Sequence, residues 1–145
     1  NKLDALSRGS IIYGNASAAT TVLTKGGAAT VLTSDGTDIS WSAATGGTSW
    51  QAVVTGATQT AVAGNGYFIN TTSNACTLTL PAGTLGDEVS VIDYAGTFDT
   101  NTLTITANGS EKIHSSTDDL TATIERAAFT LVFTDSTQGW LLKDK

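Results

Sequence analysis

The feature that most constrains the fold is a strict alternation of apolar residues and threonine in several short runs. Residues 76–80 read Cys-Thr-Leu-Thr-Leu, and residues 103–107 read Leu-Thr-Ile-Thr-Ala. Successive side chains of a β-strand point to opposite faces, so this period of two predicts strands with one buried face and one Thr-covered face. Residues 120–125 and 129–133 follow the same pattern, whereas residues 89–94 are apolar on both faces and are typical of a central strand.

Composition and turn chemistry extend this pattern to most of the chain. Thr accounts for 27 of the 145 residues and Gly for 15, while only 14% are charged. Helical bundles are normally rich in Lys, Glu and Leu, so a helical fold is not expected. Turn sequences separate the apolar runs, at residues 64–66, 81–83, 95–96, 108–109 and 138–139. About eight or nine strands in residues 50–145 then predict an antiparallel β-sandwich or jelly-roll-like domain.

Residues 1–49 have a different character. Short apolar triplets alternate there with small residues, and a flexible Thr-Gly-Gly-Thr-Ser stretch at residues 45–49 marks a domain boundary. A segment with so few large side chains has too little core to offset its chain entropy. We therefore expect residues 1–49 to form a fibrous, β-rich shaft or attachment segment, with a disordered Ala/Thr/Gly tether as the alternative.

In the shaft interpretation, three parallel copies of the segment pool their apolar side chains along a common axis, which makes the protein a homotrimer. The residues expected to pack in this way are Ile11, Tyr13, Val31, Leu32 and Trp41.

Charge and hydropathy exclude two classes of partner. Residues 1–49 are neutral, and residues 50–145 carry the whole formal charge of −6. Such a domain would repel a phosphate backbone, so nucleic-acid binding is not expected. Every apolar stretch is far shorter than the roughly 18 residues needed to span a bilayer, so membrane insertion is not expected either. Because the sequence contains no Met, we expect a processed chain or a fragment, with Asn1 not the initiator product.

Catalytic chemistry has few candidate residues. His114 is the only histidine, and Cys76, the only cysteine, alternates in phase with buried leucines. A Ser/His/Asp triad would converge only in space, and no nucleophile-elbow motif points to one. We therefore expect no enzyme, no cofactor and no metal. A Ca²⁺ or Mg²⁺ ion is a weaker alternative that no ligand spacing supports. Its candidate ligands are Asp93, Asp99, Asp118 and Asp119.

Two stretches resemble modules of tailed-bacteriophage fibres. Residues 9–15, Gly-Ser-Ile-Ile-Tyr-Gly-Asn, followed by residues 29–41 resemble a repeat of tail-fibre and other virion structural proteins. The second half is similar to a small domain of fibres from marine and cyanobacterial phages. The matching segments are residues 66–72, 78–82, 86–89, 101–105 and 139–140. The resemblance implies a trimeric, non-enzymatic component of a tail fibre or head fibre, and it brings no catalytic residues.

The expected function is structural and adhesive, with a host glycan bound by the distal domain. Exposed aromatic rings could stack on sugars, and the candidates are Tyr67, Phe68, Tyr94 and Phe98. The sharpest hypothesis is a loop-tip site made by Tyr94, Thr97, Phe98 and Asp99. We favour packing of these rings in the core or in the trimer interface over that site.

Two other functions stay open at this stage. The first is a capsid or tail decoration or cement-type protein whose residues 1–49 dock onto another virion protein. The second is a bacterial cell-surface adhesin module.

Overall fold

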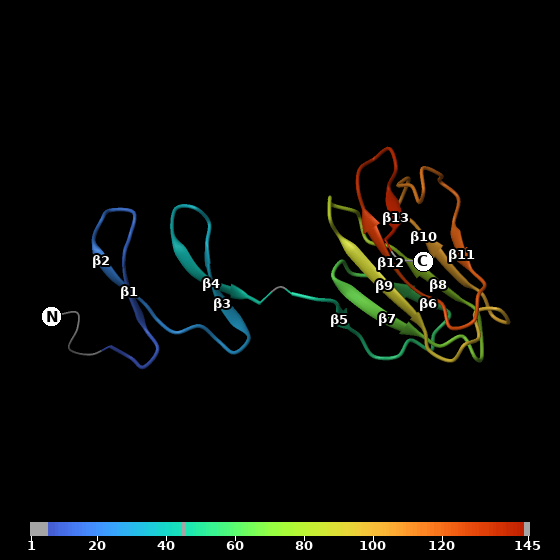
Figure 1. Ribbon diagram of the computed structural model, residues 1–145, viewed down its shortest axis with the longest axis horizontal. Helices are drawn as coiled ribbons and strands as arrows, with labels where there is room; N and C mark the ends of the chain where they lie inside the picture. Colours follow the sequence, from blue (N-terminus) through green and yellow to red (C-terminus); the bar gives the residue numbers. More distant parts are fainter. Residues whose placement is uncertain (1–5, 45, 144–145) are drawn as a thin grey trace. The chain divides into compact units, whose positions relative to one another are not determined.

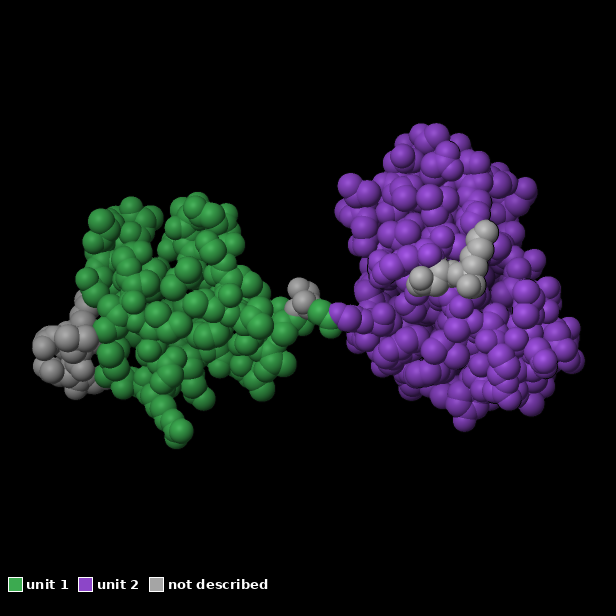
Figure 2. Space-filling view, viewed as in Figure 1, with its two compact units in different colours: residues 1–46 green, residues 47–145 purple. Residues whose placement is uncertain are grey.

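A computed structural model describes residues 6–44 and 46–143. Every regular element among these residues is a β-strand, which confirms the all-β prediction. The chain divides into two compact units, residues 1–46 and residues 47–145 (Figure 2). The division lies three residues before the expected boundary, because Ser49 already belongs to a strand that pairs within unit 2.

Unit 1 consists of two short antiparallel hairpins (Figure 1). Their strands are β1 (Ile11–Gly14), β2 (Thr20–Leu23), β3 (Thr30–Ser34) and β4 (Ile39–Ala43). Side-chain oxygens close both turns, as is common for Asn and Asp. Asn15 Oδ1 accepts the N–H groups of Ser17 and Ala19, and Asp35 Oδ1 accepts those of Thr37 and Asp38.

One side chain ties the two hairpins of unit 1 together. Trp41 on β4 donates its indole N–H to the carbonyl oxygen of Thr24, at 2.7 Å, in the segment that connects the hairpins. The ring lies against Gly26, where a Cβ would collide with it. Beyond this contact the unit has little interior, because no side chain within residues 6–44 is buried.

Unit 2 contains two sheets that share one hydrophobic core. The five-stranded sheet, sheet C below, has the order β13-β12-β9-β7-β5, and the four-stranded sheet, sheet D below, has the order β11-β10-β8-β6 (Figure 1). The strands are β5 (Ser49–Trp50), β6 (Thr58–Thr60), β7 (Asn65–Ile69), β8 (Cys76–Thr79), β9 (Glu88–Asp93), β10 (Leu103–Thr106), β11 (Leu120–Ala122), β12 (Ala128–Phe133) and β13 (Trp140–Leu142).

The strand order corrects the expectation of an antiparallel, jelly-roll-like domain. From β5 to β10 the chain alternates between the two sheets, so each new strand lies parallel to the strand before it in the same sheet. Only β11, β12 and β13 add antiparallel pairs. The turn sequence at residues 64–66 therefore leads the chain across to the other sheet, whereas an antiparallel domain would have many of its turns return the chain alongside the preceding strand.

The core consists of the residues that alternate with threonine and other outward-facing positions. The buried side chains come from both sheets, and they include Ile69, Cys76, Leu78, Val89, Val91, Leu103, Ile105, Leu131 and Trp140. This confirms the predicted inward faces of residues 76–80 and 103–107. Ile124 differs, because β11 ends at Ala122 and leaves the Ile124 side chain 72% exposed.

One glycine in unit 2 is required by space as well as by backbone conformation. Gly139, with φ of +71°, precedes β13, and a Cβ there would collide with the main chain of Lys112. Gly109 has a similar φ of +57° but open space around it.

We expect Gly139→Ala to lower the free energy of unfolding by roughly 1–3 kcal/mol more than Gly109→Ala. Urea unfolding followed by tryptophan fluorescence measures both values. Equal losses would show that Lys112 moves aside without cost.

Candidate functional site

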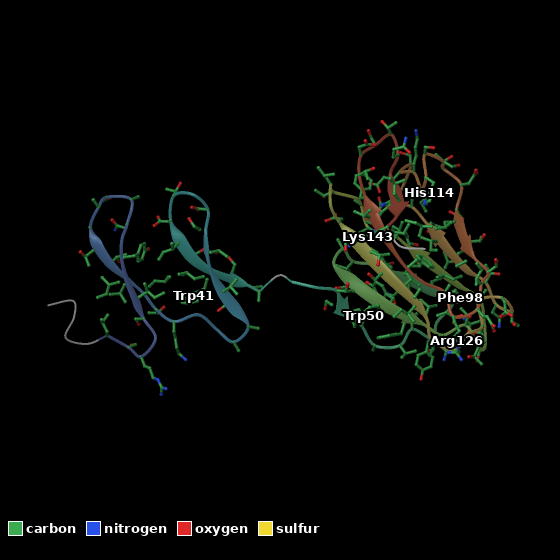
Figure 3. All side chains as sticks on the ribbon, viewed as in Figure 1. Trp41, Trp50, Phe98, His114, Arg126 and Lys143 are labelled. Carbon is green, nitrogen blue, oxygen red and sulfur yellow. The ribbon has the colours of Figure 1, made fainter. Side chains whose placement is uncertain are left out.

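An aromatic pair, of which Trp50 is exposed and Phe68 is half-buried, lies on the outer face of sheet C. Trp50, on the edge strand β5, pairs with Gly66 of β7, and its indole lies over the position where Gly66 has no side chain. The indole also stacks on the ring of Phe68, with centroids 4.7 Å apart and planes 28° apart. Trp50 nevertheless keeps 45% of its surface exposed. We call Trp50, Gly66 and Phe68 the Trp50 platform, and Trp50 is labelled in Figure 3.

A shallow hollow of about 320 Å³ adjoins the platform. Trp50 and Ile92 contribute apolar surface to it, and Thr48, Ser90 and Thr130 contribute hydroxyl groups. The hydroxyl oxygens of Ser90 and Thr130, on neighbouring strands β9 and β12, are 2.9 Å apart and share a hydrogen bond. The hollow therefore offers paired hydroxyls beside an aromatic surface.

A second, more polar hollow shares Thr48 and Ser90 with the first and has a volume of about 540 Å³. Asn65 and Asp87 line it, together with an ion pair in which Lys143 Nζ lies 2.8 Å from Glu88 Oε1. Both members of this pair are substantially exposed, so solvent screens it and it adds little stability. We call the two hollows together the Ser90 groove.

The expected loop-tip site does not form as a surface. Phe98 is completely buried in the core, so its ring cannot stack on a ligand. Of the two aromatic rings of this site, Tyr94 alone is exposed, at 52%, and Asp99 is exposed beside the buried Phe98. Thr97 Oγ1 lies 2.8 Å from Thr71 Oγ1, and Asp99 accepts a hydrogen bond from the Thr100 hydroxyl. The site hypothesis is therefore wrong for Phe98, and the core packing that we favoured describes its ring correctly.

A buried carboxylate explains why Phe98 points inward. Asp93 is only 2% exposed, and its two oxygens accept four backbone N–H groups. Oδ1 binds those of Gly96 and Thr97, and Oδ2 binds those of Phe98 and Arg126, at 2.9–3.2 Å. These bonds fold residues 94–98 back onto the core. They also occupy the oxygens that the metal alternative required of Asp93.

The other two aromatic candidates from the sequence lie on β7 and point in opposite directions. Tyr67 is buried at 2%, and its hydroxyl oxygen accepts the N–H of Val62 at 2.8 Å. Phe68 is half-buried because Trp50 covers it. Sequence reasoning did not include Trp50 among the aromatic candidates. The sequence feature that could have pointed to Trp50 is Gly66, because a glycine inside a strand often marks the close approach of another group.

In the part of the chain that the structure describes, the reactive side chains do not form a catalytic or metal-binding cluster. Burial raises the pKa of the Cys76 thiol, which keeps it protonated and poorly nucleophilic. His114 Nε2 accepts the backbone N–H of Leu142 at 3.2 Å. Within residues 6–44 and 46–143 no group of three or more His, Cys, Asp or Glu side chains could hold a metal ion. Among the same residues, no helix is long and apolar enough to cross a membrane.

An apolar hollow of about 590 Å³ lies beside the edge strand β11. Leu120, Ala122, Phe129 and Leu142 line it, and the exposed Ile124 stands at its rim. Sequence reasoning placed Leu120, Ala122, Ile124 and Phe129 on inward faces but assigned no face to Leu142. It did not indicate that the two sheets leave a space there.

The residues expected to pack in the shaft all lie on the hairpins of unit 1. Ile11, Tyr13 and Trp41 are half-buried, whereas Val31 and Leu32 are each 44% exposed. Leu32 is paired in register with Trp41, so these two side chains share one face of the second hairpin.

The sequence was compared with protein-family models and with curated proteins. No protein-family model matches the chain, and no curated protein is detectably similar to it in sequence. The proposed function therefore rests on the residues of the chain itself.

The carboxylate of Asp93 generates a stability prediction. In Asp93→Asn an amide NH₂ replaces one oxygen and faces backbone N–H groups that then lack an acceptor. We expect the free energy of unfolding to fall by about 2–3 kcal/mol. The matched control Asp99→Asn, at an exposed carboxylate, should change it by less than about 0.5 kcal/mol. Denaturant titration measures both, and a small loss for Asp93→Asn would contradict the role given to this carboxylate.

Proposed function

We propose that the chain is a non-enzymatic, structural and adhesive component of a phage virion fibre. In this proposal unit 1 assembles as a homotrimer and unit 2 presents a binding surface to a host glycan. The observation that carries the proposal is the absence of any buried side chain within residues 6–44, although this segment folds into two hairpins rich in apolar residues.

Isolated two-stranded hairpins are marginally stable in water at best. Unit 1 leaves apolar surface open to solvent, at Ile12, Val31 and Leu32, which are 37%, 44% and 44% exposed. Complete burial of one such side chain is worth roughly 1.5–3 kcal/mol. Coverage by other chains therefore supplies the core that the unit lacks.

The distribution of apolar residues on the first hairpin favours a closed ring of several copies. Ile11 pairs with Leu23 on one face, and Ile12 pairs with Val22 on the other. A hairpin with two apolar faces can pack between two neighbours, and a head-to-tail contact of this kind closes into a ring when its rotation is suitable. The resemblance of residues 9–15 and 29–41 to a phage-fibre repeat supports three copies.

The adhesive part of the proposal rests on unit 2. This unit has a core of its own, so its outer faces are available for recognition. On sheet D every outward position within the strands is a threonine, and these strands contain no charged residue. The outward residues are Thr58, Thr60, Thr77, Thr79, Thr104, Thr106 and Thr121. Sheet C presents the Trp50 platform and the Ser90 groove instead.

The exposed apolar residues of unit 1 also favour a second candidate function. In a capsid or tail decoration protein, another virion protein would cover Ile12, Val31 and Leu32 in place of two further copies. The purified chain would then be a monomer, and particles without it would lose stability while still binding to host cells.

The trimer is tested on the full chain by light scattering after size exclusion. We expect a mass of three times 14.8 kDa for the parent protein. Leu32→Asp places a charge in the proposed interface and should shift the mass towards the monomer. Val62→Asp is the matched control, because Val62 is 57% exposed but lies in unit 2, and it should remain trimeric. A monomeric parent protein would contradict the trimer and favour the decoration function.

A further inference from the structure

We infer that the Trp50 platform and the Ser90 groove form a binding site for an uncharged oligosaccharide, whose pyranose ring stacks on the indole of Trp50. This inference deepens the adhesive part of the proposed function and rests on it. It places the contact surface on the Trp50 platform and the Ser90 groove, whose lining does not include Tyr94.

The platform is held in place before any ligand arrives. The indole has backbone beneath it at Gly66 and the ring of Phe68 against it at 4.7 Å. A Trp side chain fixed in this way loses little conformational freedom on binding, which favours affinity. Its exposed surface suits the C–H-bearing face of a pyranose, which is apolar although the edges of the sugar ring carry hydroxyls.

The polar groups beside the platform match the edges of such a ring. Ser90 is only 7% exposed, so a ligand reaches the hydrogen-bonded pair mainly through the half-buried Thr130. When Ser90 is the donor within the pair, the Thr130 hydroxyl keeps its hydrogen and a lone pair for the ligand. A sugar hydroxyl both donates and accepts, and it can therefore bridge this pair. Thr48 lines the groove at the same point, where the two hollows meet.

The groove is large enough for more than one sugar ring. Each of its hollows, at about 320 Å³ and about 540 Å³, lies within the range of small-molecule sites. A ring stacked on Trp50 would occupy the first hollow. The next ring would reach the second, where the Asn65 amide and the Glu88–Lys143 ion pair supply donors and acceptors.

Charge selects against acidic sugars. Unit 2 contains four basic and ten acidic side chains, and the groove itself has Asp87 and Glu88 against Lys143. A uronate, sialate or phosphorylated sugar would meet this negative field, whereas a neutral hexose or N-acetylhexosamine would not. The ligand class is therefore neutral, and its binding should depend little on salt concentration.

Binding is tested on the full chain by isothermal titration with neutral tri- and tetrasaccharides of glucose, galactose, mannose and N-acetylglucosamine. Sialylated and uronate-containing oligosaccharides serve as charged counterparts. We expect at least one neutral probe to bind and the charged probes to bind at least about tenfold more weakly. Preference for an acidic probe, or the absence of binding by every neutral probe at millimolar concentration, would overturn the inference.

Two aromatic variants of matched exposure locate the site. Trp50→Ala should weaken binding at least about tenfold, whereas Tyr94→Ala should leave it within about twofold. Since Trp50→Ala uncovers Phe68 and can perturb folding, Thr130→Val supplies a second variant that keeps the shape and removes a hydroxyl, and it should also weaken binding. Loss of binding in Tyr94→Ala alone would overturn the assignment to sheet C.

The mass of the same samples separates this inference from the proposed assembly. A trimer that binds no neutral saccharide would overturn the inference and leave the structural part of the proposed function standing. A monomer that binds a neutral saccharide through Trp50 would support the inference and contradict the proposed trimer.

Discussion

Apolar burial is divided unequally between the two units, and the rest of the structure depends on this division. Unit 2 buries residues such as Leu78, Ile105 and Leu131 completely between its two sheets. Unit 1 buries no side chain within residues 6–44 and relies on hydrogen-bonded turns and on the contact of Trp41 with Gly26. The order of unit 2 therefore follows from its own sequence, whereas in our proposal the order of unit 1 depends on association with other chains.

The chain of unit 2 alternates between the two sheets, and this path gives the two outer faces different chemistry. Because consecutive strands from β5 to β10 cross between the sheets, the Thr-x-Thr runs of β6, β8 and β10 add to sheet D and stack in register there, as in the pairing of Thr77 with Thr58 and Thr104. Sheet C instead receives the aromatic run at residues 67–68 and the edge residue Trp50. One face is thus a uniform hydroxyl surface, and the other combines an aromatic platform with a polar groove.

The sequence predicts strands and their buried faces well, because the period of two is a local property. It does not predict which strand pairs with which. A turn at Gly64 can return the chain alongside the preceding strand, or it can lead the chain across to the other sheet. The inward position of Phe98 depends on Asp93, whose carboxylate joins segments as far apart as residues 96 and 126. The Trp50 platform likewise needs Gly66 of a neighbouring strand, and no local pattern links these two residues.

The central claim is that unit 1 becomes stably ordered only through association. Amide hydrogen exchange of the full chain, measured over a range of protein concentrations, tests it most directly. The predicted result is that protection of β1 to β4 rises with the fraction of oligomer, while protection of β7 to β12 stays constant. Equal and strong protection of both units in a dilute, monomeric sample would contradict the claim.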